Sequence, residues 1–128
     1  MTSDDSEQQG ARQPGVALVV DDDAGVRMCT ADVLADMGYE VLEADSAEQA
    51  LQALERGVTP ALLVTDHLMP GMSGSDLARL VHARLPEAAV IVVSGYTDVV
   101  LDPGLVLLGK PFRLKELRDC VQAATARG

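Results

Sequence analysis

The chain has few aromatic side chains: of its 128 residues, one is phenylalanine, two are tyrosine and none is tryptophan. Because 48% of the residues are nevertheless hydrophobic, the core must be built from valine, leucine, isoleucine and alanine. That composition suits a sheet covered by helices on both faces. The length allows one domain with a substantial core and leaves little for a second.

Positive charge is also scarce, since 10 lysines and arginines stand against 20 aspartates and glutamates, a formal net charge of −10 at pH 7. Nucleic acids and anionic membranes are therefore not expected as partners. No hydrophobic run approaches the roughly 18–20 residues of a membrane span, and the acidic start MTSDDSEQQ is unlike a signal peptide. A cytoplasmic protein is expected.

Cysteine is limited to Cys29 and Cys120, which lie far apart on predicted helices. There is no CxxC pair and no histidine at the spacing of a metal ligand, so neither a zinc site nor a disulfide is indicated. We interpret both cysteines as small hydrophobic core residues.

Strand and helix patterns alternate along the chain after residues 1–15, which lack hydrophobic periodicity and are expected to form a flexible tail. The predicted domain, residues 16–128, has strands at 16–20, 39–44, 61–65, 89–93 and 104–108. Helices are predicted over about 26–37, 46–57, 77–85 and 113–124, with room for only a turn or two of helix between 95 and 104. Short connections between alternating elements require right-handed crossovers and a mostly parallel sheet, an α/β fold.

Distinctive polar residues follow the ends of four of these strands: Asp21 and Asp22 after the first, Asp66 after the third, Ser94 after the fourth and Lys110 after the fifth. Each alone has an ordinary explanation as a turn, cap or solvated residue. Because ligands bind outside the carboxyl ends of the strands in such sheets, their convergence predicts a site.

The chemistry of these residues is consistent with phosphoryl transfer. Carboxylates a few ångström apart need a cation between them, and oxygen ligands suit Mg²⁺. A phosphoryl group bound there would need a lysine to neutralise it and a hydroxyl to hydrogen-bond one of its oxygens. Lys110 is one of only two lysines in the chain.

Four blocks of sequence, namely the strand-end DD, VTDHLMPGMSG, VVSG and LGKPF, resemble the receiver domain of two-component response regulators over about residues 16–126. The resemblance implies a flavodoxin-like, doubly wound (βα)5 fold with strand order 2-1-3-4-5. It implies that Asp66 accepts a phosphoryl group from a phosphohistidine of a sensor histidine kinase or histidine phosphotransfer protein. Asp22, Asp66 and the backbone carbonyl of Leu68 would bind Mg²⁺, with Asp21 acting through a water molecule.

The same resemblance implies that Lys110 pairs with the acidic group or the phosphoryl oxygen, that Ser94 turns toward the phosphoryl group, and that the Lys110–Pro111 bond is cis. Asp23 has no such role and is interpreted as a residue that supports the start of the first helix, where an acidic side chain suits the helix dipole. His67 is predicted to be an exposed surface residue directed away from Asp66. We expect a phosphoacceptor that slowly hydrolyses its own acyl phosphate, not an enzyme acting on a foreign substrate, and a monomer or weak dimer.

The sequence departs from the family pattern at Leu107, where many receivers carry an aromatic residue, and in the short segment between Ser94 and Lys110. The short segment implies a stunted or absent fourth helix, as in receivers attached to hybrid histidine kinases and in some stand-alone relatives. We hypothesise that Tyr96, with Leu68, shields the acyl phosphate from water and tunes its lifetime. No output domain is expected.

Two other functions remain open from the sequence. Asp21 and Asp23 form a D-x-D pattern similar to that of haloacid-dehalogenase phosphatases, in which Asp21 would be the nucleophile. A receiver-like interaction module that is not phosphorylated is the other alternative. The lack of an aromatic side chain at position 107, which is Leu107, favours it.

Overall fold

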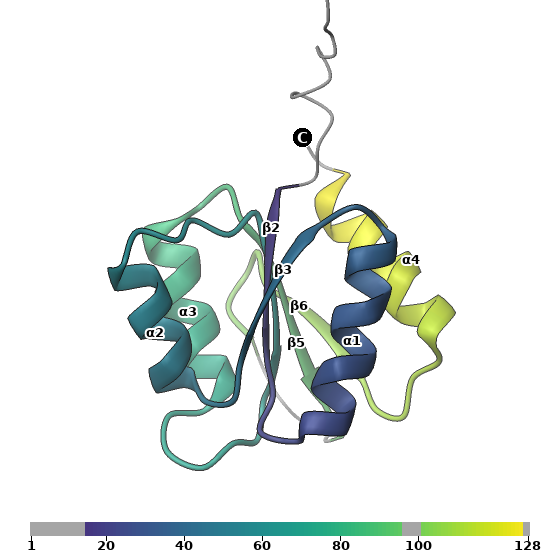
Figure 1. The fold of residues 1–128 in the computed structure, drawn as a ribbon, viewed down its shortest axis with the longest axis horizontal. Helices are drawn as coiled ribbons and strands as arrows, with labels where there is room; N and C mark the ends of the chain where they lie inside the picture. Colours follow the sequence, from purple (N-terminus) through teal and green to yellow (C-terminus); the bar gives the residue numbers. More distant parts are fainter. Residues whose placement is uncertain (1–14, 96–100, 127–128) are drawn as a thin grey trace, which may run out of the picture.

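The computed structural model describes residues 15–95 and 101–126, and its five parallel strands form one sheet in the order β3-β2-β4-β5-β6 (Figure 1). The strands are β2 (Val16–Val20), β3 (Glu40–Ala44), β4 (Leu62–Asp66), β5 (Ala89–Ser94) and β6 (Val106–Gly109). The helices are α1 (Ala24–Asp36), α2 (Ala47–Glu55), α3 (Gly74–Arg84) and α4 (Leu114–Thr125). This strand order confirms the predicted doubly wound fold.

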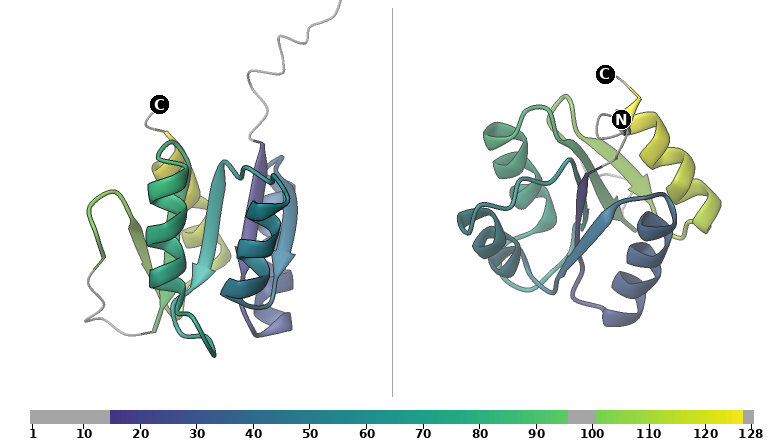
Figure 2. Two further views of the ribbon diagram at one scale, coloured as in Figure 1. Left: turned by 90° about the vertical axis from the view of Figure 1, so that its left-hand side faces the viewer. Right: turned by 45° about the horizontal axis from the view of Figure 1, so that its top comes forward.

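The sheet is the middle of three layers, with α2 and α3 on one face and α1 and α4 on the other (Figures 1 and 2). Successive residues of a strand point to opposite faces. Leu18 and Val20 accordingly join the core beneath α2 and α3, whereas Ala17 and Val19 join the core beneath α1 and α4. Burial on both faces explains why these strands are continuous hydrophobic runs in the sequence.

The ends of α1 are set by local chemistry. Asp23 is the N-cap, and its carboxylate accepts a hydrogen bond from the backbone N–H of Val26 at 3.1 Å. Asp23 thus lies at the helix start, as expected, and the hydrogen bond adds to the favourable helix dipole on which that expectation was based. Beyond the helix, Gly38 has a φ of 103°, and the next N–H, that of Tyr39, donates to the carbonyl of Leu34 at 3.1 Å. A glycine is favoured there because other residues rarely adopt a positive φ.

The connection from β5 to β6 differs from the prediction. The fifth strand was expected over 104–108, but β6 begins at Val106. Gly104 has a φ of 95°, and the N–H of Leu105 donates to the carbonyl of Asp102 at 3.2 Å, so a turn precedes the strand. Residues 101–105 contain no helix, which agrees with the expectation that the fourth helix is stunted or absent, while residues 96–100 lie outside the described residues.

The prediction that both cysteines are core residues is wrong for Cys29, which is exposed. The buried side of α1 is formed instead by Thr30, Ala31, Val33 and Leu34. Cys120 on α4 is half-buried and packs against the core on that side of the sheet.

Two further expectations concern the chain as a whole. The tail predicted over residues 1–15 lies outside the described residues except for Gly15. Within the described ranges, none of the helices has the length and hydrophobicity needed to cross a membrane.

Candidate functional site

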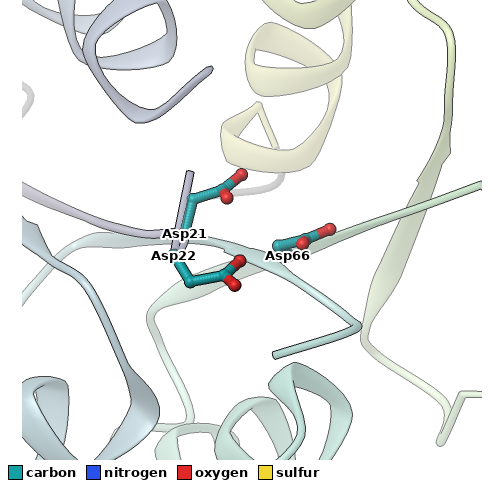
Figure 3. Close-up of side chains that lie close together, drawn as sticks. All are labelled: Asp21, Asp22 and Asp66. Carbon is teal, nitrogen blue, oxygen red and sulfur yellow. The ribbon is translucent and has the colours of Figure 1, made fainter. Parts of the chain in front are cut away.

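Three carboxylates meet at the carboxyl edge of the sheet (Figure 3). Asp21 and Asp22 directly follow β2, and Asp66 is the last residue of the neighbouring strand β4. One carboxylate oxygen from each of the three lies within 4.8 Å of those of the other two. The convergence predicted from the strand ends is therefore found for these residues, because β2 and β4 are adjacent and parallel.

A single cation contacts this cluster among the described ion pairs. The Nζ atom of Lys110 lies 3.1 Å from Oδ1 of Asp66. Lys110 follows β6, and its backbone N–H donates to the carbonyl of Ser94 at 2.8 Å. Ser94 is the last residue of β5 and is 3% exposed, so this hydroxyl-bearing residue is buried at the same edge of the sheet. The Lys110–Pro111 peptide bond is cis, as the resemblance implied.

The three carboxylates differ in their surroundings. Asp21 is only 6% exposed, Asp66 is 9% exposed and Asp22 is open to solvent. Burial raises the pKa of Asp21, and the neighbouring charges of Asp66 and Asp22 raise it further, against a hydrogen bond from the Asp23 N–H and the charge of Lys110. A raised pKa means that the ionised form is disfavoured. A divalent cation between these oxygens would remove that penalty.

The donor set of the cluster fits Mg²⁺. All three groups are carboxylates, and the cluster includes neither a thiol nor an imidazole. Hard divalent cations prefer oxygen ligands, and Mg²⁺ is commonly held by one or two carboxylates together with phosphate oxygens and water. Asp22 is exposed, which leaves the cluster accessible from solvent.

The loop that follows Asp66 is held close to the cluster by backbone contacts. The N–H of His67 donates to the carbonyl of Val93 at 2.8 Å, and the N–H of Gly74 donates to the carbonyl of His67 at 2.9 Å. A Cβ atom on Gly74 would lie 1.7 Å from the carbonyl oxygen of Asp66, so this position requires glycine. Leu68, whose carbonyl was predicted to be a metal ligand, lies in this loop with a side chain that is 62% exposed.

His67 is not the exposed surface residue that was predicted. It is half-buried, and its Nδ1 atom shares a hydrogen bond of 2.6 Å with Oγ of Ser75 at the start of α3. Strand alternation gives the direction of a side chain relative to the sheet but does not show that a helix begins beside it.

Two residues of this edge were not identified from the sequence. The Arg27 side chain contacts the backbone carbonyl of Asp21, and the Glu48 carboxylate accepts a hydrogen bond from the N–H of Met72 in the loop after Asp66. Arg27 lies six residues after Asp21, and its position in the predicted helix does not reveal this contact. Nothing in the sequence links Glu48 to a residue 24 positions later.

For two residues singled out in the sequence, the structure does not test the predicted role. Tyr96, proposed to shield the acyl phosphate, lies outside the described residues. Leu107, which stands where many receivers have an aromatic residue, lies in β6 and is 38% exposed. The expectation that the usual aromatic relay is missing at this position stays a prediction.

Comparisons with known proteins agree with the geometry. The family model for the response regulator receiver domain matches residues 17–122. Nodulation protein W of Bradyrhizobium diazoefficiens is 36% identical over 127 residues, which cover 91% of this chain and 54% of that protein. The response regulator receiver protein CpdR of Brucella abortus is 31% identical over 106 residues, covering 78% of this chain and 88% of that protein.

Among solved structures, the receiver domain of the hybrid histidine kinase CckA superimposes with a TM-score of 0.73 at 37% identity. The match covers 87% of this chain and 99% of that domain. Several curated relatives are much longer, so that the chain spans about half of Nodulation protein W and smaller fractions of others.

Proposed function

The chain belongs to the response regulator receiver domain family, and from this membership we propose that it accepts a phosphoryl group on Asp66 in a two-component or phosphorelay pathway. The observation that carries the proposal is the 3.1 Å contact between Lys110 and Asp66 within a cluster of three carboxylates. Asp66 is the cluster carboxylate with a bound ammonium, so it is the one at which added negative charge can be balanced.

The proposed reaction transfers a phosphoryl group from a phosphohistidine. A carboxylate oxygen of Asp66 forms the new bond to phosphorus, the bond between phosphorus and the donor's imidazole nitrogen breaks, and that nitrogen takes up the electron pair. The ammonium of Lys110 balances the charge on the phosphoryl oxygens. The hydroxyl of Ser94 hydrogen-bonds one of these oxygens.

The residues proposed to hold Mg²⁺ are Asp22, Asp66 and the carbonyl of Leu68, with Asp21 acting through water. When bound, Mg²⁺ supplies charge neutralisation at the carboxylates and the phosphoryl group. Water would later hydrolyse the acyl phosphate slowly, which restores Asp66. The chain would turn over no foreign substrate.

The partner proposed for this reaction is a sensor histidine kinase or a histidine phosphotransfer protein in the cytoplasm. One structural relative is the receiver domain of a hybrid histidine kinase. The net charge of −10 argues against nucleic acid as a direct partner and against binding to an anionic membrane. We expect a monomer or weak dimer.

The decisive test is Asp66→Asn, which keeps the shape of the side chain and an oxygen for Lys110 but removes the nucleophile. Incubation with Mg²⁺ and a small acyl phosphate should label the wild-type chain and leave Asp66→Asn unlabelled, as measured by intact mass. Asp76→Asn, a change at an exposed carboxylate on α3, is the matched control and should label normally.

Peptide mapping of the labelled wild-type chain separates this function from the alternatives. A modified Asp66 is expected. Modification of Asp21 would instead support the phosphatase chemistry, and full labelling of Asp66→Asn would contradict the assignment. The absence of any response to Mg²⁺ or beryllofluoride in amide shifts near Asp66 would favour an interaction module that is not phosphorylated.

A further inference from the structure

The Arg27 side chain bridges β3 and the residue that follows β2 at the edge of the site. Its Nη1 atom donates to the backbone carbonyl of Asp21 at 2.8 Å, and its Nε atom donates to Oε1 of Glu43 on β3 at 3.0 Å. The side chain is 18% exposed, less than half the value for its partner Glu43. Hydrogen bonds donated by a largely buried guanidinium are among the stronger ones in proteins.

Asp21 is held at three points by these and neighbouring contacts. Its N–H donates to the carbonyl of Ala44 at 3.1 Å, its Oδ1 accepts from the N–H of Asp23 at 2.9 Å, and its carbonyl accepts from Arg27. The first contact ties the chain to β3, and the second closes the turn into α1. Arg27 is the side chain that holds the peptide unit between Asp21 and Asp22.

Asp22 depends on this peptide unit more than the other two carboxylates do. Asp21 receives the N–H of Asp23 and Asp66 receives Lys110, whereas the Asp22 carboxylate makes no hydrogen bond or ion pair within the described ranges 15–95 and 101–126. Asp22 is also exposed, so packing does not restrain it. The direction of its side chain is therefore set by its backbone.

We propose that Arg27 is a positioning residue for the Mg²⁺ site: the guanidinium, bridging the Asp21 carbonyl and the Glu43 carboxylate, fixes the peptide that aims Asp22 at Asp66. This inference rests on the proposed function, since it concerns the same metal site. Groups that hold metal ligands in place commonly change metal affinity 10- to 100-fold when removed.

Glu43 has a supporting role in this arrangement. Its carboxylate orients the guanidinium and balances its charge, so that a cation beside the site does not repel the incoming metal ion. A planar guanidinium can bond two acceptors at once, which a lysine ammonium on a flexible chain does less well.

The test is a titration with Mg²⁺ alone, in which binding is monitored through the amide chemical shifts of the turn after β2. Arg27→Met keeps the aliphatic stem and removes both hydrogen bonds, and it should weaken Mg²⁺ binding about tenfold or more. Loss of a positive charge near three carboxylates would by itself strengthen binding. A weaker affinity therefore identifies lost geometry and not lost charge.

Arg79→Met is the matched control, because Arg79 is an exposed arginine of α3 whose partner is Asp76. It removes the same charge without touching the turn, and its affinity for Mg²⁺ should stay within about twofold of the wild type. Arg27→Lys keeps the charge and one donor, and should bind Mg²⁺ more tightly than Arg27→Met but less tightly than the wild type. If Arg27→Met does not fold, the comparison of Arg27→Lys with the wild type decides, and equal affinity overturns the proposal.

Labelling by a small acyl phosphate provides a second readout. At saturating Mg²⁺, Arg27→Met should label at close to the wild-type rate, with the Mg²⁺ concentration for half-maximal labelling raised about tenfold. If the wild type binds Mg²⁺ and is labelled on Asp66, but Arg27→Met binds Mg²⁺ equally or more tightly, the role of Arg27 alone is overturned. A wild type that binds no Mg²⁺ overturns the proposed function as well.

Discussion

At the scale of single residues, the carboxylates of the site differ in their burial and in their charged neighbours. Asp66 has the ammonium of Lys110 at 3.1 Å, whereas Asp21 is buried beside two other carboxylates and has a raised pKa. Such a residue lowers the stability of the metal-free protein when it is ionised, because its charge is poorly solvated. The charge of Asp21 is therefore expected to lower the stability of the metal-free protein, and the proposed Mg²⁺ would offset this cost.

The variant Asp21→Asn tests this conclusion. Asparagine keeps an oxygen for the N–H of Asp23 but removes one of three charges that lie within 4.8 Å. At this separation like charges repel by about 1 kcal/mol in water and several times more in a protein. In EDTA at pH 7 we expect Asp21→Asn to raise the free energy of unfolding by about 1–2 kcal/mol, measured by urea denaturation.

The same variant should lose this advantage when Mg²⁺ is added, because the metal then has one carboxylate fewer. Asp32→Asn, at an exposed position of α1, removes an equal charge away from the cluster and serves as the control. A lower stability of Asp21→Asn in EDTA would show that the Asp21 charge is not a cost to the fold.

At the scale of elements, the loop between β4 and α3 is tied to α2. Oε2 of Glu48 accepts a hydrogen bond from the N–H of Met72 at 3.2 Å. The same oxygen lies 3.0 Å from the position a Cβ atom would take on Gly71, whose φ is 80°. The first turn of α2 thus restrains the loop that contains Leu68.

We expect Glu48→Ala to release this part of the loop. A net hydrogen bond contributes about 1 kcal/mol, so exchange of the Met72 amide with solvent should become about fivefold faster, measured by hydrogen exchange and NMR. Glu55→Ala, at the other end of α2, is the control and should leave that rate unchanged. An unchanged Met72 rate in Glu48→Ala would mean that the contact does not restrain the loop.

At the scale of the whole molecule, the fold places its acidic cluster at one edge of the sheet in a chain with a net charge of −10. The three carboxylates come together only in the folded state, because Asp66 is more than forty residues from Asp22 in the chain. A ligand that binds only the folded state stabilises it by mass action.

Mg²⁺ should therefore raise the free energy of unfolding with increasing concentration, by about 2.7 kcal/mol at one hundred times the dissociation constant. Thermal denaturation with and without EDTA measures this effect. Asp22→Ala should lose most of it, and sodium chloride of equal ionic strength should reproduce little of it. Equal stabilisation of Asp22→Ala would place the metal elsewhere or indicate general screening.

The sequence was a sufficient guide to the sheet and to the cluster, for a definite physical reason. Strands buried on both faces are continuous runs such as VALVV and ALLVT, and right-handed crossovers bring the residues after them to one edge. Asp21, Asp22, Asp66 and Lys110 could therefore be predicted to meet before any coordinates were known. The position of Asp23 before a helical pattern was likewise enough to predict its place at the helix start, but not its hydrogen bond with Val26.

Only the tertiary structure decided the contacts that hold this edge in place. Exposure of Cys29, burial of His67 against Ser75, and the contacts of Arg27 and Glu48 depend on how a helix is rotated against the sheet and on which strand lies next to it. Periodicity determines which elements form and where they end, because it reflects burial of one face. It carries no information on which polar side chain meets which backbone group across elements, and that pairing is set by packing.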